Sequence, residues 1–269
     1  MAKKKKSGPA SADTAQPENR LPGEGSVKSS SAGTGAENVA RPLYAQVEVL
    51  NAARHADLRL VQAKDVMFAA GLNSIRLAGI ELPQAATCYP VVFAETGDGW
   101  AAYAVTGHSN GKNEFVADDG QWRAGNYVPA FVRRYPFILS TNSQDESLSL
   151  AADLSSAMLS VVEGQPLYEE GKPSKTALAI LKFCTSYHDQ IRVSGRLFRQ
   201  IADTGILQSR RAEVTLADGE RRVIEGFHTV DESRLNALKD DDFLELRKSG
   251  ALNLIYCHLW SMRSWKQIL

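Results

Sequence analysis

Closely spaced glycine turns between short β-rich runs restrict the fold of this chain more than any other feature. The turns fall at Gly97-Asp98-Gly99, Ser109-Asn110-Gly111 and Asp118-Asp119-Gly120. The first turn separates Tyr89–Ala94 from Trp100–Thr106, which predicts a tight hairpin. Asn-Gly suits a type I′ turn because both residues tolerate positive φ, and a further short run, Asn113–Val116, follows it. The pattern predicts an antiparallel β-meander of three or four strands.

Strand patterns also occur on both sides of this meander. Val47–Leu50 alternates like a half-buried strand, and Ile75–Leu77 has the composition of a short extended piece. Further on, Ala212–Leu216 and Arg222–Ile224 flank an Asp218-Gly219 turn. By the same turn logic these two runs predict a second, small hairpin.

Two long stretches have helical spacing. Leu148–Val162 places apolar side chains on one stripe and ends before Gly and Pro stop signals, which predicts a helix. A longer pattern begins at Pro173-Ser174 and continues to Gly205, with a break expected near Ser194-Gly195.

The last forty residues carry further helix signals. Thr229-Val230-Asp231-Glu232 has the spacing of a capping box, and helices are predicted after it, over Asp241–Arg247 and over Trp260–Leu269. The elements together predict an α+β fold: an antiparallel β-meander with helices packed on one side and a second small hairpin.

The first 43 residues differ in composition from the rest of the chain. They contain no aromatic residue, and they hold seven basic and four acidic side chains, a net charge of +3. Such a segment buries too little apolar surface to offset the entropy of ordering it. We therefore predict a disordered basic tail over residues 1–43 and one folded α+β domain over residues 44–269.

Charge and hydropathy exclude several classes of function. The whole chain has 31 basic and 31 acidic residues, so no global field attracts nucleic acid or an anionic membrane. The lysine run at residues 3–6 is followed by small polar residues rather than by the apolar stretch of a secretory signal. No apolar run reaches the length of a membrane span. These observations predict a cytoplasmic protein with no membrane span.

The residues that carry chemistry form no recognisable constellation. Cys88, Cys184 and Cys257 are odd in number and widely spaced, which predicts free buried thiols in a reducing compartment. None of the five histidines has metal-ligand spacing, and phosphate-binding and nucleophile-elbow motifs are missing. We expect no metal and no cofactor, and we assign no catalytic residue.

The segment Trp122–Leu139 is unusually dense in large side chains. It combines five aromatic residues with two prolines and the pair Arg133-Arg134. Aromatic residues and arginine supply rigid contact area and bidentate hydrogen bonds, as recognition surfaces require. The same aromatic residues could instead fill a core between sheet and helices, with an arginine paired to an internal carboxylate. Both interpretations stay open at this point.

This segment resembles the signature of the SapC family of bacterial proteins. The similarity extends over Tyr89–Phe93, Gly120–Phe137 and Gly226–Glu232, and His55–Arg59 is similar to the family's opening element. It covers about residues 43–269, with one inserted residue, Asn126.

The resemblance implies a role in general terms. The family is named for association with a bacterial surface layer, and its members are often encoded beside outer-membrane receptors and flavin-dependent halogenase-like proteins. It implies no catalytic residue. Our first hypothesis is a non-enzymatic accessory protein that binds a protein, peptide or glycan partner through Trp122, Tyr127, Arg133, Arg134, Tyr135, Phe137, His228 and Asp231.

The second hypothesis is an enzyme that modifies peptides or small molecules in a pocket near Arg133, Arg134, His228 and Asp231. Whether the chain is an enzyme therefore stays open. The two hypotheses differ in whether polar groups converge on a pocket or lie on an open face.

Overall fold

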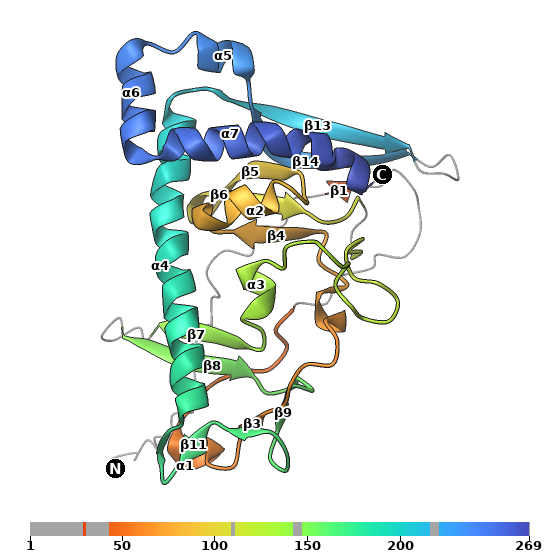
Figure 1. Ribbon diagram of the computed structural model, residues 1–269, viewed down its shortest axis with the longest axis vertical. Helices are drawn as coiled ribbons and strands as arrows, with labels where there is room; N and C mark the ends of the chain where they lie inside the picture. Colours follow the sequence, from red (N-terminus) through yellow and green to blue (C-terminus); the bar gives the residue numbers. More distant parts are fainter. Residues whose placement is uncertain (1–28, 31–42, 109–110, 142–146, 216–220, 269) are drawn as a thin grey trace, which may run out of the picture.

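The computed structural model describes residues 29–30, 43–108, 111–141, 147–215 and 221–268. These residues form an α+β fold arranged along one long helix (Figure 1). The strands are β1 Ser29–Ser30, β2 Val47–Val49, β3 Arg59–Leu60, β4 Ser74–Leu77, β5 Val91–Thr96, β6 Gly99–Val105, β7 Phe137–Thr141, β8 Leu148–Asp153, β9 Leu159–Ser160, β10 Gln165–Pro166, β11 Tyr168–Glu169, β12 Lys172–Pro173, β13 Leu207–Thr215 and β14 Arg221–Val230. The helices are α1 Ala52–His55, α2 Leu82–Ala85, α3 Ala130–Arg133, α4 Lys175–Asp203, α5 Glu232–Asn236, α6 Asp240–Ser249 and α7 Ala251–Ser261, with the 3-10 turns η1 Met67–Ala69, η2 Gly79–Glu81 and η3 Met262–Gln267.

The main sheet has the strand order β1-β14-β5-β6-β4, and β13 pairs with β14. The predicted hairpin is its centre: β5 and β6 pair from Val91↔Ala104 to Thr96↔Gly99. Gly99 has a φ of +104°, a conformation that side-chain-bearing residues rarely adopt, so glycine closes this turn. The tight hairpin and the antiparallel α+β class are both confirmed.

The second hairpin is also confirmed, but it joins the main sheet. Strands β13 and β14 pair over Leu207↔Val230 to Thr215↔Arg221, and β14 reaches β5 through His228↔Phe93. The turn residues 216–220 lie outside the described part of the chain, as do residues 1–28 and 31–42 of the predicted disordered tail.

The helix predicted over Leu148–Val162 is wrong, because this segment forms β8 and β9. Strand β8 is the centre of a three-stranded sheet, between β2 and β7. Ala151 and Ala152 are both fully buried and belong to different apolar clusters, so both faces of the strand are covered. A strand buried on both faces loses the apolar–polar alternation of a half-exposed strand, so its sequence pattern can resemble that of a helix.

The strand predicted over Asn113–Val116 is absent from the described structure. The only pairing there is an isolated bridge between Val116 and Trp122. Asn113 is buried and stabilises a loop instead. Its side-chain Nδ2 donates to the Ala69 carbonyl at 3.1 Å, and its side-chain Oδ1 accepts from the Phe115 backbone amide at 2.9 Å. Side-chain bonds of this kind compete with a strand ladder. Residues 109–110 of the adjacent turn lie outside the described residues.

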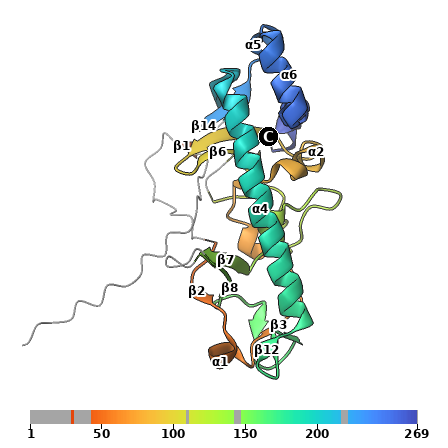
Figure 2. The same ribbon diagram turned by 90° about the vertical axis from the view of Figure 1, so that its left-hand side faces the viewer.

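Helix α4 is continuous for 29 residues, so the break expected near Ser194-Gly195 does not occur. It packs along both β6 of the main sheet and β7 of the smaller sheet (Figure 2). The Ser194 hydroxyl accepts from the Gly79 amide at 2.6 Å and donates to the Gln190 carbonyl. Gly195 lies against β6, where an added Cβ would be 3.9 Å from the Trp100 carbonyl oxygen. Both residues serve close packing rather than a helix end.

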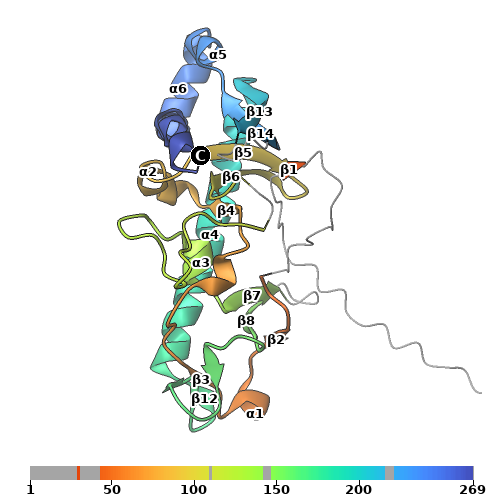
Figure 3. The same ribbon diagram turned by 90° about the vertical axis from the view of Figure 1, so that its right-hand side faces the viewer.

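The C-terminal helices begin and end differently from the prediction. The cap of α5 is Asp231 rather than Thr229, because the Asp231 carboxylate accepts from the Ser233 and Arg234 amides. Helix α7 begins at Ala251, and a 3-10 turn, η3, continues from it to Gln267. Helices α2 and α7 lie over the same side of the main sheet (Figure 3). No helix among the described residues is long and apolar enough to span a membrane.

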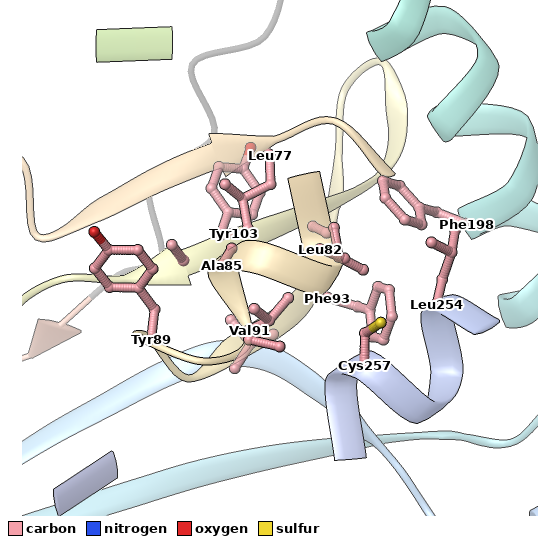
Figure 4. Packing of buried hydrophobic residues seen from close by; sticks show 14 of the residues in the cluster. Leu77, Leu82, Ala85, Tyr89, Val91, Phe93, Tyr103, Phe198, Leu254 and Cys257 are labelled. Carbon is pink, nitrogen blue, oxygen red and sulfur yellow. The ribbon is translucent and has the colours of Figure 1, made fainter. Parts of the chain in front are cut away.

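The largest apolar core lies between the main sheet, α2, α7 and the C-terminal part of α4. Phe93, Phe198, Leu254 and Cys257 meet there (Figure 4). Cys88, Cys184 and Cys257 are all buried and free, as predicted. His258 crosses this core with no exposed surface: its Nε2 accepts from the Val230 amide at 3.0 Å, and its Nδ1 donates to the Val91 carbonyl at 2.6 Å.

We expect His258 to make the fold acid-sensitive. Burial lowers the pKa of His258 from 6.5 to about 4. Between these values the unfolded chain binds the proton and the folded chain does not, so the free energy of unfolding falls as pH is lowered from 6.5 to 4. The loss is on the order of 3 kcal/mol.

His258→Gln should give a shallower decline than the wild type when urea unfolding is measured between pH 7 and pH 4.5. Equal slopes for the two proteins would contradict the assignment of this histidine as buried and neutral.

Candidate functional site

A buried carboxylate positions the short helix α3. Glu81, at the end of η2, is 4% exposed. Its Oε2 accepts from the Ala78 amide at 2.8 Å, and its Oε1 accepts from the Tyr127 hydroxyl at 2.9 Å and from the Ala130 amide at 2.7 Å. Since Ala130 is the first residue of α3, Glu81 ties the start of this helix to the main-sheet region.

The two arginines at the end of α3 point to different environments. Arg133 is exposed and donates to the Val128 carbonyl and the Tyr127 hydroxyl. Arg134 turns inward, with its guanidinium carbon 4.7 Å from the ring centre of Phe131, 5.1 Å from that of Tyr187 and 5.7 Å from that of Tyr44. Aromatic faces attract a cation, which favours this placement.

Arg134 lines a cavity of about 400 Å³ that runs along α4. The residues around it come from α4, the β5–β6 hairpin, β4, α3 and β7: Arg76, Asp98, Gly99, Trp100, Phe131, Arg134, Ile138, Leu139, Cys184, Tyr187, His188, Ile191, Arg192, Gly195, Arg196 and Arg199. Cys184, Tyr187 and Ile138 are buried, whereas Arg192, Arg196, Arg199 and Asp98 are exposed. The cavity therefore has a buried end and an exposed rim.

The lining is strongly cationic. It holds five arginines and a single carboxylate, that of Asp98. Within the described part of the chain, none of Arg134, Arg192, Arg196 and Arg199 forms an ion pair with a carboxylate. Arginine presents several donors in a planar fork that matches carboxylate and phosphate oxygens. The cavity is thus suited to an anion.

Two polar atoms at the buried end lack hydrogen-bond partners among the described residues. They are Nε of Arg134 and the hydroxyl of Tyr187, a residue that is 7% exposed. Burial raises the pKa of Tyr187, so its hydroxyl stays protonated and able to donate. Buried donors are nearly always paired, so two donors without a partner on neighbouring side chains distinguish this end of the cavity.

The thiol at this end is not activated. Burial raises the pKa of Cys184 to about 11, which outweighs the opposing effect of Arg134. A thiol with a raised pKa is a poor nucleophile because the thiolate is the reactive form.

Most aromatic residues of the sequence-predicted site have structural partners. Trp122 Nε1 donates to the Tyr89 hydroxyl at 3.1 Å, and Tyr127 donates to Glu81. The Tyr135 hydroxyl donates to Asp153 at 3.3 Å, and Phe137 is 3% exposed in an apolar cluster. These contacts match the core interpretation of the segment for the aromatic residues, while Arg134 faces the cavity.

The pocket expected near Arg133, Arg134, His228 and Asp231 does not bring these four residues together. Among them the cavity lining contains Arg134 alone. His228, on β14, packs its ring against Trp100 with centres 4.9 Å apart, and burial lowers the pKa of His228. Asp231 caps α5.

Sequence reasoning missed the arginines of α4. Arg192, Arg196 and Arg199 are spaced i, i+4 and i+7, which places them on one helical face. The sequence shows this spacing, but it does not show which other elements this face of the helix packs against. Among the described residues, no group of His, Cys, Asp and Glu side chains could hold a metal ion.

Two tyrosine variants should show the difference in stability between losing a hydroxyl without a hydrogen-bond partner and losing a hydroxyl that has one. Tyr187→Phe removes an unpartnered buried hydroxyl, so we expect the free energy of unfolding to stay unchanged or rise. Tyr135→Phe leaves a lone pair of Asp153 without its donor and should cost about 1 kcal/mol. Urea unfolding of both variants at neutral pH measures this, and a cost above about 1 kcal/mol for Tyr187→Phe would show that its hydroxyl is paired within the chain.

Comparison with known proteins gives one match. The family model described as SapC matches residues 50–268, which is most of the chain and includes every residue that lines the cavity. No curated protein and no solved structure matches the chain. The chain belongs to the SapC family.

Proposed function

We propose that this chain is a non-enzymatic, cytoplasmic binding protein that holds an anionic group of its partner in the cavity along α4. The partner is a protein, peptide, glycan or small molecule that carries a carboxylate or phosphate. Association with a bacterial surface layer or with outer-membrane uptake systems is part of the proposal, and the family resemblance supports it. Three free buried thiols are consistent with a reducing compartment.

The buried end of the cavity carries the proposal. Arg134 is partly buried, and aromatic rings, rather than a carboxylate of the described residues, surround its guanidinium. Removing a cation from water is costly unless an anion and hydrogen bonds compensate. A bound oxyanion would accept from both Arg134 Nε and the Tyr187 hydroxyl, two donors of lining residues that have no partner among the described residues. It would also gain the field of the neighbouring arginines.

The enzyme alternative has weaker support. A covalent mechanism needs an activated nucleophile beside a base. Burial raises the pKa of Cys184, the thiol in the cavity, to about 11, so this thiol is a poor nucleophile although His188 also lines the cavity; His228 and Asp231 are not among the lining residues. Binding is therefore the function that the geometry favours.

Substitution of Arg134 should weaken anion binding strongly without unfolding the chain. We expect Arg134→Met to bind biphenyl-4-carboxylate at least tenfold more weakly than the wild type, because a charge-assisted hydrogen bond is worth about 1.5–3 kcal/mol. Isothermal titration calorimetry gives the affinity, and thermal unfolding without ligand checks the fold.

Two further variants keep the test sharp. Arg134→Lys retains the charge but loses the planar fork, so it should recover only part of the affinity. Lys182→Ala removes an exposed positive charge from the same helix outside this cavity and should leave binding unchanged. Equal weakening by Lys182→Ala and Arg134→Met would contradict a site at Arg134, as would a wild type that binds no anionic probe.

A further inference from the structure

The exposed rim of the cavity carries a second group of arginines. Arg196 and Arg199 follow Tyr187 on α4 and are exposed, whereas Tyr187 lies at the buried end of the cavity. Nine residues of helix separate Tyr187 from Arg196, which corresponds to about 14 Å along the axis. The cavity therefore presents cationic groups at two separate places rather than at one.

The β5–β6 turn accommodates one of these rim arginines. A Cβ added to Gly99 would lie 3.0 Å from Nη2 of Arg199, so the guanidinium rests directly on the glycine. A larger residue here would displace Arg199 and strain the turn as well, because φ is +104°. Asp98 on the same turn forms no ion pair with the rim arginines within the described part of the chain. The Arg199 guanidinium therefore contacts the turn at Gly99 and pairs with no carboxylate among the described residues.

Apolar side chains also line the cavity between the two cationic places, beside Arg192, which lies between Tyr187 and Arg196 on α4. Phe131 and Ile138 line the cavity near Arg134, and Trp100 and Ile191 line it toward the rim. A volume of about 400 Å³ is in the range of pockets that hold small organic molecules.

We propose that the ligand is an elongated dianion with an apolar, ring-containing body and a carboxylate or phosphate at each end. Arg134 and Tyr187 bind one end, and Arg196 and Arg199 bind the other. This inference rests on the proposed function and deepens it, because it states the class of molecule that the site selects.

An arginine on the rim could also act from a distance, by attracting any anion. That effect depends on the total charge, and salt screens it beyond about 8 Å at physiological ionic strength. Direct contact with a second anionic group instead depends on which arginine is present and persists in salt. The experiment can separate the two.

Matched probes with one and two charges test the proposal. We expect biphenyl-4,4′-dicarboxylate to bind the full chain about tenfold more tightly than biphenyl-4-carboxylate, one additional charge-assisted contact being worth about 1.4 kcal/mol. The double variant R196A/R199A should lose this preference, so that the dicarboxylate binds the variant no more than about twofold more tightly than the monocarboxylate does. Calorimetry at physiological and at higher salt measures both affinities.

The matched control is Lys182→Ala, which removes a charge from the same helix and should keep the tenfold preference. Biphenyl compounds with one and two phosphonate groups, run in parallel, show whether the ends are carboxylates or phosphates. A monocarboxylate that binds through Arg134 with no gain for the dicarboxylate would overturn the dianion inference and leave the proposed function standing. A preference that Lys182→Ala reduces as much as R196A/R199A does would also overturn it.

Discussion

The buried carboxylate of Glu81 is the interaction on which the rest of the site depends. It accepts three hydrogen bonds, from η2, from the Tyr127 hydroxyl and from the first amide of α3. An acceptor so fully satisfied can be buried at little cost, whereas removal of any donor would leave part of a charge unpaired. Because Glu81 sets where α3 begins, it also sets where α3 ends, and Arg134 follows directly. The position of the arginine at the cavity therefore depends on a carboxylate that is not among the lining residues.

Helix α4 supplies the opposite wall and joins the two halves of the molecule. It passes from the smaller sheet to the main sheet without a break, with Ser194 and Gly195 packed closely against η2 and β6. The same helix thereby carries Tyr187 at the buried end of the cavity and Arg196 and Arg199 at the rim. A rigid wall of this kind holds the two cationic places at a constant separation, which is what selection of ligands by length requires.

Local signals in the sequence predicted the parts of the fold that local geometry determines. The β5–β6 and β13–β14 hairpins follow from glycine turns between β-rich runs, and α4 follows from its long helical period. Strand β8 could not be predicted, because burial of both Ala151 and Ala152 removes the alternation that identifies a strand. For the site, Arg134 was among the predicted residues, but Tyr187 and Arg196 were not. Tertiary packing brings Tyr187 close to Arg134 and places Arg196 at the rim of the same cavity, and no spacing in the sequence encodes that arrangement.

The most direct test is a crystal structure with bound 4-iodobenzoate, in which anomalous scattering from iodine fixes the orientation of the molecule. The account predicts the carboxylate within hydrogen-bonding distance of Arg134 Nε and the Tyr187 hydroxyl, with iodine toward Trp100. Calorimetry should also detect binding of 4-iodobenzoate in solution. An Arg134 guanidinium paired with a carboxylate of its own chain, and no iodine in the cavity, would contradict the account.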